Sequence, residues 1–189
     1  MNVVAIIEAR MGSTRLPEKT LMDLAGVTLL ERVVERIKLA KTVDEVVVAT
    51  SVNQKDNVIY DLCQAKSIHC FRGSEDDVLG RVYEAAKKYR ADVVVQSGAD
   101  CPFYDPELID LLVGIIKWGG YAYTANDMKL TFPEGIDAHV ICFNALEASA
   151  NEAKDPKERD DTPRFIWNHP ERFPIFNLEA WLTMKVKQV

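Results

Sequence analysis

Apolar residues follow two alternating patterns along this chain. Short continuous apolar runs rich in β-branched residues predict strands that are buried on both faces. These runs are residues 2–7, 44–50, 68–71, 92–96, 121–126 and 136–143. Apolar positions three and four residues apart predict amphipathic helices, at residues 27–40, 56–65, 74–89 and 145–153. This alternation predicts an α/β fold.

Two of the predicted helices have recognisable ends. Asp105 and Pro106 form a cap and a first-turn proline, and Gly119-Gly120 ends the apolar helix that follows them. Ser74, with Asp77 three residues later, resembles a capping box, so a helix is expected to start there. The acids of residues 75–77 then suit the positive end of that helix.

Composition places the chain among ordinary globular proteins. Its 189 residues suit a single domain, with 48% hydrophobic and 28% charged residues. No apolar run reaches the roughly 18 residues of a membrane span, and no signal peptide precedes the first strand, which together predict a cytoplasmic protein without a membrane partner. The net charge of −6 argues against nucleic acid as a partner.

The cysteines and histidines are dispersed. The four cysteines contain no C-x-x-C pair, so reduced thiols are expected in a cytoplasmic protein, and a cysteine–histidine zinc site is not expected. They are Cys63, Cys70, Cys101 and Cys142.

The loop after the first predicted strand concentrates positive charge. Residues 8–19 carry Arg10, Arg15 and Lys19 around Gly12, on an acidic chain. Ligands of α/β proteins bind at the carboxyl ends of strands, and arginine and lysine suit phosphate groups. Gly12 lets the backbone approach a ligand closely. The loop therefore predicts a polyphosphate cradle; the alternative is a solvated loop whose arginines pair with surface carboxylates.

The same loop carries a family resemblance. Residues 6–21, IIEARMGSTRLPEKTL, resemble the opening motif of the cytidylyltransferases that activate acidic sugars, in particular the spore-coat polysaccharide biosynthesis protein F group. The acylneuraminate and 3-deoxy-manno-octulosonate cytidylyltransferases are similar. The resemblance implies a three-layer α/β/α sandwich with a mostly parallel sheet, the nucleotide-diphospho-sugar transferase (GT-A-like) fold. It also implies that CTP is held by Ala9, Arg10, Met11, Gly12, Ser13, Arg15 and Lys19.

Two further segments match the family on the nucleotide side. Residues 72–81 resemble a segment that lines the site near the base and ribose, which implies that Arg72 and Arg81 bind the nucleotide; surface ion pairs are the alternative. Asp100 follows the strand at 92–96 and matches a family aspartate. A carboxylate there is a natural Mg²⁺ ligand, because magnesium is usually held by one or two carboxylates plus substrate phosphates. The alternative is a turn aspartate bonded to its own backbone. Gly98 and Ala99 depart from the family pattern.

The remaining matches concern the sugar. Asp137 corresponds to a family aspartate on the sugar side of the cleft, and His139 stands where a glutamate is usual. Residues 162–173 resemble a segment that, in relatives, helps to form the sugar pocket and the subunit contact, which implies a homodimer. Lys185 stands where the family has a second metal-binding aspartate, and the chain ends sooner than its relatives. That ending raises the expectation of a weakened site, of a metal site that uses Asp137 instead, or of an inactive chain.

The resulting hypothesis is CMP transfer from CTP to an acidic sugar, with release of pyrophosphate, in surface polysaccharide biosynthesis. The catalytic residues expected are Arg10, Arg15, Lys19 and Asp100, with Mg²⁺ as cofactor. Two alternatives stay open: a glycosyltransferase that uses a nucleotide-sugar donor on the same fold, and a nucleotide-binding protein that has lost turnover.

Overall fold

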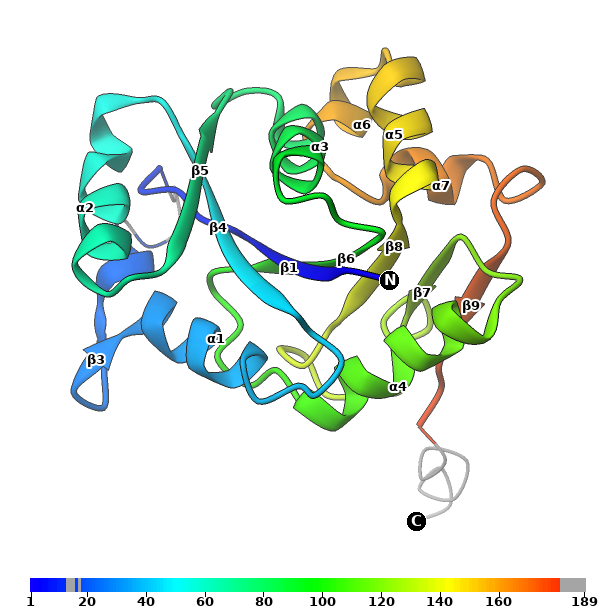
Figure 1. Cartoon of the computed structure of the whole chain (residues 1–189), viewed down its shortest axis with the longest axis horizontal. Helices are drawn as coiled ribbons and strands as arrows, with labels where there is room; N and C mark the ends of the chain where they lie inside the picture. Colours follow the sequence, from blue (N-terminus) through cyan, green and yellow to red (C-terminus); the bar gives the residue numbers. More distant parts are fainter. Residues whose placement is uncertain (13–15, 17, 181–189) are drawn as a thin grey trace.

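A seven-stranded sheet forms the centre of the molecule (Figure 1). The computed structural model describes residues 1–12, 16 and 18–180. In this described part the strand order is β5-β4-β1-β6-β8-β7-β9, and only β8 runs antiparallel to its neighbours in the sheet. The strands are β1 (Val3–Glu8), β4 (Glu45–Ser51), β5 (His69–Gly73), β6 (Val93–Gly98), β7 (Tyr123–Ala125), β8 (His139–Cys142) and β9 (Ile175–Asn177).

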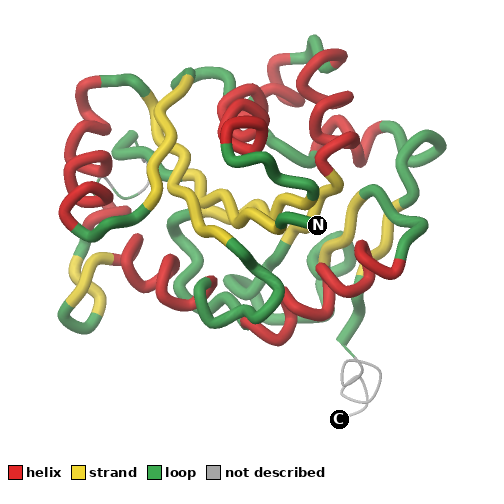
Figure 2. The backbone as a smooth tube through the Cα atoms, viewed as in Figure 1, coloured by secondary structure: helices red, strands yellow, loops and turns green. Residues whose placement is uncertain are grey.

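Helices cover both faces of this sheet (Figures 1 and 2). The side chains of β1 alternate between the two helical layers: Val3 packs in one core and Val4 in the other, and both are fully buried. A strand with apolar contacts on both faces needs a continuous apolar sequence, which explains the pattern at residues 2–7. The three-layer sandwich and the mostly parallel sheet are therefore confirmed. One layer contains α1 (Leu29–Ile37), α2 (Asn57–Ala65) and α4 (Pro106–Trp118), and the other contains α3 (Val78–Lys88), α5 (Phe143–Glu152) and α7 (Arg164–Asn168).

The helix predicted at 27–40 is shorter at both ends than expected. Residues Val27–Thr28 form β3, which pairs with β2 (Asp23–Leu24) as a small hairpin. The helix α1 then begins behind a capping box, in which the Thr28 hydroxyl accepts from the Glu31 backbone N–H at 3.2 Å and the Glu31 carboxylate accepts from the Thr28 N–H at 2.9 Å. The cap stops the helix from extending back into residues 27–28.

The helix α3 starts later than the predicted capping box at Ser74. Its N-cap is Asp77, whose carboxylate accepts from the Gly80 N–H at 2.9 Å, while the Ser74 hydroxyl accepts from the Asp77 N–H. Asp77 also pairs with Arg159 of the short helix α6 (Pro156–Arg159). Ser74 therefore shapes the turn before the helix, and Asp77 both caps the helix and ties it to α6.

Several shorter elements differ from the expectation. The expected strands at 121–126 and 136–143 shorten to β7 and β8, and Phe143 begins α5. The 3₁₀ turns Lys19–Leu21 and Gln54–Asp56, the helices α6 and α7, and β9 were not predicted. The four cysteines are free thiols, as expected. Among the described residues, no helix has the length and apolar character that crossing a membrane requires.

Candidate active site at the carboxyl ends of β1 and β6

A pocket of about 370 Å³ opens where two central parallel strands end. Strands β1 and β6 pair in register, so that Glu8 lies beside Gly98 and the loops that follow leave the sheet together. The Ala99 N–H donates to the Glu8 carbonyl at 3.0 Å, which ties one loop to the other. The lining residues are Glu8, Ala9, Arg10, Gly12, Lys19, Thr20, Val78, Arg81, Gly98, Ala99, Asp100 and Asp160.

The first loop contributes most of the predicted cradle. Arg10 and Lys19 line the pocket, and the Arg10 carbonyl accepts a hydrogen bond from the buried Thr20 hydroxyl at 3.1 Å. The Met11 N–H donates to the Asp56 carboxylate at 2.8 Å, and Asp56 is itself buried. These contacts hold the start of the loop to the body of the protein, with Ala9 and Gly12 also in the lining. Ser13 and Arg15, two further predicted contacts, lie outside the described residues.

Lys19 and Asp100 form an ion pair across the mouth of the pocket. The Asp100 side chain is 47% exposed and that of Lys19 is 30% exposed, so both remain accessible to a ligand. Gly98 permits this arrangement, because a Cβ at that position would lie 2.6 Å from the Asp100 Oδ1 atom. The unexpected glycine before Asp100 therefore has a steric reason here. The lysine expected to bind phosphate therefore lies directly beside the carboxylate expected to bind metal.

The oxygen ligands near Asp100 suit a divalent metal that is held by one carboxylate together with substrate phosphates. The described residues contain no cluster of three or more acidic, histidine or cysteine side chains that suits a metal ion. A single accessible carboxylate still fits Mg²⁺ or Mn²⁺ when substrate phosphates supply the remaining oxygens. Asp100 is that carboxylate. Lys185, at the place of the family's second acid, lies outside the described residues.

Glu8 is a pocket residue that the sequence hypothesis did not include. Its Oε1 atom accepts from Gln96 Nε2 at 2.9 Å and from the Thr162 hydroxyl at 2.8 Å. Burial raises the pKa of this carboxyl, while the two hydrogen bonds and the charge of Arg81 act to lower it. The available sequence signal was an acid that ends an apolar strand directly before a cationic loop.

The two arginines of the 72–81 segment occupy different places. Arg81 is 3% exposed, lines the pocket, and donates through one nitrogen to the Ser74 and Glu75 carbonyls. Burial lowers the pKa of its guanidinium, and its Nε atom has no hydrogen-bond partner in the described structure. Arg72 lies outside the lining of this pocket: it donates to the Ser51 and Asn53 carbonyls at 3.0 and 3.2 Å.

The predicted sugar-side residues lie on β8, which pairs with β6, and in the loop before it. His139 faces Gln96 in the β6–β8 register. Its Nδ1 atom contacts the Tyr123 hydroxyl, and its Nε2 atom lies 3.5 Å from the Asp127 carboxylate. Burial lowers the pKa of His139, and burial raises the pKa of Asp137. Neither is in the pocket lining, although Asp137 and Asp100 are both close enough to Cys101 to raise the pKa of its thiol by their charges.

Comparison with known proteins agrees with this fold. A family model described as Cytidylyltransferase matches residues 4–163. The spore coat polysaccharide biosynthesis protein SpsF of Bacillus subtilis is 34% identical over 184 residues, covering 95% of this chain and 75% of that protein. A cytidylyltransferase structure from Leptospira borgpetersenii is 31% identical, with a TM-score of 0.90 over 96% of this chain and 77% of that one.

A more distant structure shares the fold alone. It is CMP:2-keto-3-deoxy-manno-octonic acid synthetase complexed with CTP, with a TM-score of 0.71 at 18% identity, covering 95% of this chain and 90% of that one. The family match spans most of the chain, including both loops of the pocket. The chain belongs to the cytidylyltransferase family.

Proposed function

We propose that this protein transfers CMP from CTP to a hydroxyl group of an acidic sugar and releases pyrophosphate, in surface polysaccharide biosynthesis. The observation that carries the proposal is the Lys19–Asp100 pair, which joins a phosphate-binding cation and an accessible carboxylate at the shared edge of β1 and β6. The family membership and the printed names of SpsF and the sugar-acid synthetase support the choice of CTP and sugar.

The residues of the first loop bind and orient the triphosphate. Arg10 and Lys19 lie within one pocket and offset the negative charge that accumulates as pyrophosphate departs. Arg15 is assigned the same role from the sequence. Holding the α-phosphate and the attacking hydroxyl together in line supplies much of the rate enhancement in such transfers.

Asp100 is the residue that would hold Mg²⁺. A bound divalent ion supplies Lewis-acid polarisation of the phosphate oxygens. Lys19 forms an ion pair with the Asp100 carboxylate, so it holds that side chain in the pocket before substrate arrives. Asp137 and His139 are proposed to contact the sugar, from β8 and the loop before it. A cytoplasmic homodimer remains part of the proposal.

A pyrophosphate-release assay tests the proposal. The protein is incubated with each of the four nucleoside triphosphates and Mg²⁺ or Mn²⁺, with and without candidate sugar acids. Release that needs CTP, metal and a sugar acid together is the expected result. Sugar transfer from a nucleotide-sugar donor would identify the glycosyltransferase alternative, and CTP binding without turnover under all conditions would identify the nucleotide-binding one.

A further inference from the structure

Two of the four cysteines lie against each other, outside the lining of the pocket. Helix α2 and strand β5 pack side by side and are joined by the turn at residues 66–68 (Figure 1). The Ile68 N–H donates to the Cys63 carbonyl at 2.9 Å, which closes this turn. Cys63 is fully buried on α2, and Cys70 on β5 packs against the same core cluster. Both side chains therefore lie between the helix and the strand.

A hydrogen bond joins the two thiols and affects them in opposite ways. It raises the pKa of Cys63 and lowers the pKa of Cys70, so the Cys63 S–H group donates to the Cys70 sulfur. Burial raises the pKa of Cys63 further. Partial burial opposes the change at Cys70, whereas the positive charges of Arg72 and Lys88 reinforce it. The pair therefore combines a sulfur that is stabilised as a thiolate with a sulfur that is held as a thiol beside it.

The two cations near Cys70 are held by contacts of their own. Arg72 follows Cys70 by two residues on β5, and its guanidinium Cζ atom lies 5.5 Å from the centre of the Tyr60 ring on α2. The Nζ atom of Lys88, at the end of α3, lies 5.8 Å from the centre of the Phe71 ring. These contacts keep positive charge near the Cys70 sulfur, which is the environment in which reactive cysteines occur.

The other two cysteines have different surroundings. The Cys142 thiol, on β8, donates to the Tyr121 carbonyl at 3.3 Å, and burial raises its pKa. Burial and then the charge of Asp100 raise the pKa of Cys101 to about 11. All four cysteines belong to the described chain, and Cys70 is the one whose pKa is lowered. Because Cys70 is partly exposed and its neighbour in the pair is fully buried, a small oxidant in the solvent meets Cys70 first.

We propose that Cys63 and Cys70 form a peroxide-responsive pair, in which hydrogen peroxide oxidises Cys70 and Cys63 then closes a disulfide between α2 and β5. The Cys70 thiolate attacks one peroxide oxygen, so that an S–O bond forms, the O–O bond breaks and hydroxide leaves; the product is a sulfenic acid. The Cys63 sulfur then attacks the Cys70 sulfur, an S–S bond forms, and the departing hydroxide takes the Cys63 proton. In total, two thiols lose two electrons and one peroxide is reduced to two molecules of water.

Peptide mapping after peroxide treatment tests this pair. The reduced chain is treated with hydrogen peroxide, the remaining thiols are alkylated, and the denatured protein is digested with trypsin. Trypsin cleaves after Lys66, so the peptides 56–66 and 67–72 carry one cysteine each. We expect a disulfide that joins these two peptides, the loss of two of the four thiols, and their recovery with dithiothreitol. Cys70 should be oxidised about tenfold or more faster than Cys142, because each unit of pKa changes the thiolate fraction about tenfold.

Three variants assign the roles within the pair. In Cys63→Ser, oxidation of Cys70 should stop at the sulfenic acid, which dimedone captures. In Cys70→Ser, the buried Cys63 should keep its thiol at the same dose of peroxide. Cys142→Ser is the matched control, because it removes another partly buried thiol, and it should leave the cross-link unchanged.

The wild-type peptide map decides the question even where a variant does not fold. Persistence of all four thiols, oxidation of Cys142 as fast as Cys70, or a cross-link between any other pair overturns the inference. Oxidation of wild-type Cys70 without a cross-link overturns the role of Cys63. Pyrophosphate release by the untreated protein tests the proposed function separately, so the inference and the proposed function can fail independently.

Discussion

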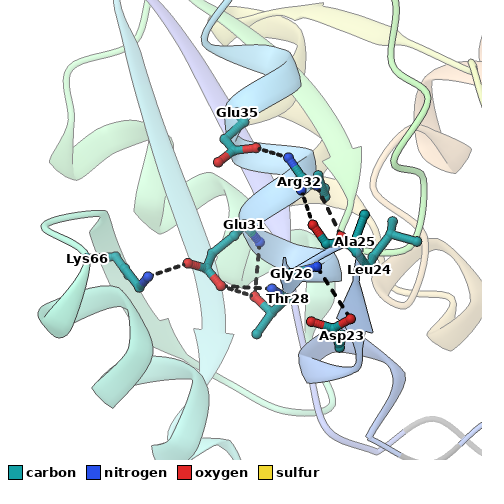
Figure 3. A network of polar contacts seen from close by, with 9 residues as sticks. All are labelled: Asp23, Leu24, Ala25, Gly26, Thr28, Glu31, Arg32, Glu35 and Lys66. Carbon is teal, nitrogen blue, oxygen red and sulfur yellow. Dashed lines mark hydrogen bonds and ion pairs between the residues drawn. The ribbon is translucent and has the colours of Figure 1, made fainter.

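Two glutamates in this protein are held in opposite ways. Glu31, at the start of α1, has partners on both carboxylate oxygens: Lys66 pairs with Oε1 at 2.8 Å, and Oε2 accepts from Thr28 (Figure 3). Lys66 and then Thr28 lower the pKa of Glu31 to about 2. Glu8, at the end of β1, uses one oxygen for two donors, and burial raises its pKa.

The contrast extends beyond these two residues. In the described chain, the network around Glu31 contains none of the buried side-chain polar atoms that lack a partner. Five of those atoms lie at or just past the carboxyl ends of strands, on Thr50, Gln96, Ser97, Asp127 and Asn177. The others belong to Arg81 and Trp167 on helices and to Glu45 at the start of β4. An unpaired buried polar group costs about 1–3 kcal/mol.

The largest effect is expected from removing the charge at Asp100. Asp100→Asn should lower turnover by about 10²–10³, the size seen when one electrostatic stabiliser of a transition state is lost. Steady-state pyrophosphate release measures it. Asp76→Asn, at an exposed acid outside the pocket lining, is the matched control and should leave the rate unchanged. Equal Mn²⁺ affinity in wild type and Asp100→Asn, with CTP present, would remove Asp100 from the metal site.

The second-largest effect, on CTP binding, is expected from removing a cation of the first loop. Lys19→Ala should weaken CTP binding by about 1–3 kcal/mol, the range for hydrogen bonds to charged groups. Arg15→Ala is expected from the sequence to do the same. Lys117→Ala removes an exposed lysine of α4 and controls for the change in net charge. Calorimetry that finds the same CTP affinity in wild type and in both cradle variants would contradict the cradle.

The sequence predicted those parts of the site that depend on residues close together along the chain. The apolar run of β1 and the cations after it are contiguous, and Asp100 directly follows an apolar run, so strand, loop and acid could be placed together. Glu8 could not be recognised in this way, because its partners Gln96 and Thr162 are 88 and 154 residues away along the chain. Arg72 was assigned to the nucleotide from resemblance, and its side chain donates to the carbonyls of Ser51, at the end of β4, and of Asn53, in the segment after it.

A stability effect without a binding effect is expected at Glu31. Glu31→Gln should lower the free energy of unfolding by about 1–2 kcal/mol at pH 7, because it removes an ion pair with a partly exposed lysine and weakens the cap of α1. Because the folded pKa of Glu31 lies below its unfolded value of about 4.3, the stabilisation is present above that pH and disappears as pH falls toward about 2. Denaturant unfolding at pH 7 and pH 3 measures the difference. CTP affinity should not change, and a loss of affinity would show that the two regions are coupled.

The smallest effect is expected from Glu8→Gln, which should raise the free energy of unfolding where Glu31→Gln lowers it. Burial raises its folded pKa, so the folded state holds the proton more tightly than the unfolded state, and ionisation destabilises the fold as pH rises above about 4.3. Glu8→Gln is neutral at every pH. It should therefore match wild type in acid and become more stable than wild type as pH rises, by less than about 1 kcal/mol. Denaturant unfolding at several pH values, without ligand, gives both curves. If Glu8→Gln lost stability with rising pH relative to wild type, as Glu31→Gln should, Glu8 would be a structural acid whose partners satisfy it fully. A gain with rising pH would show that ionisation of this buried carboxyl destabilises the fold.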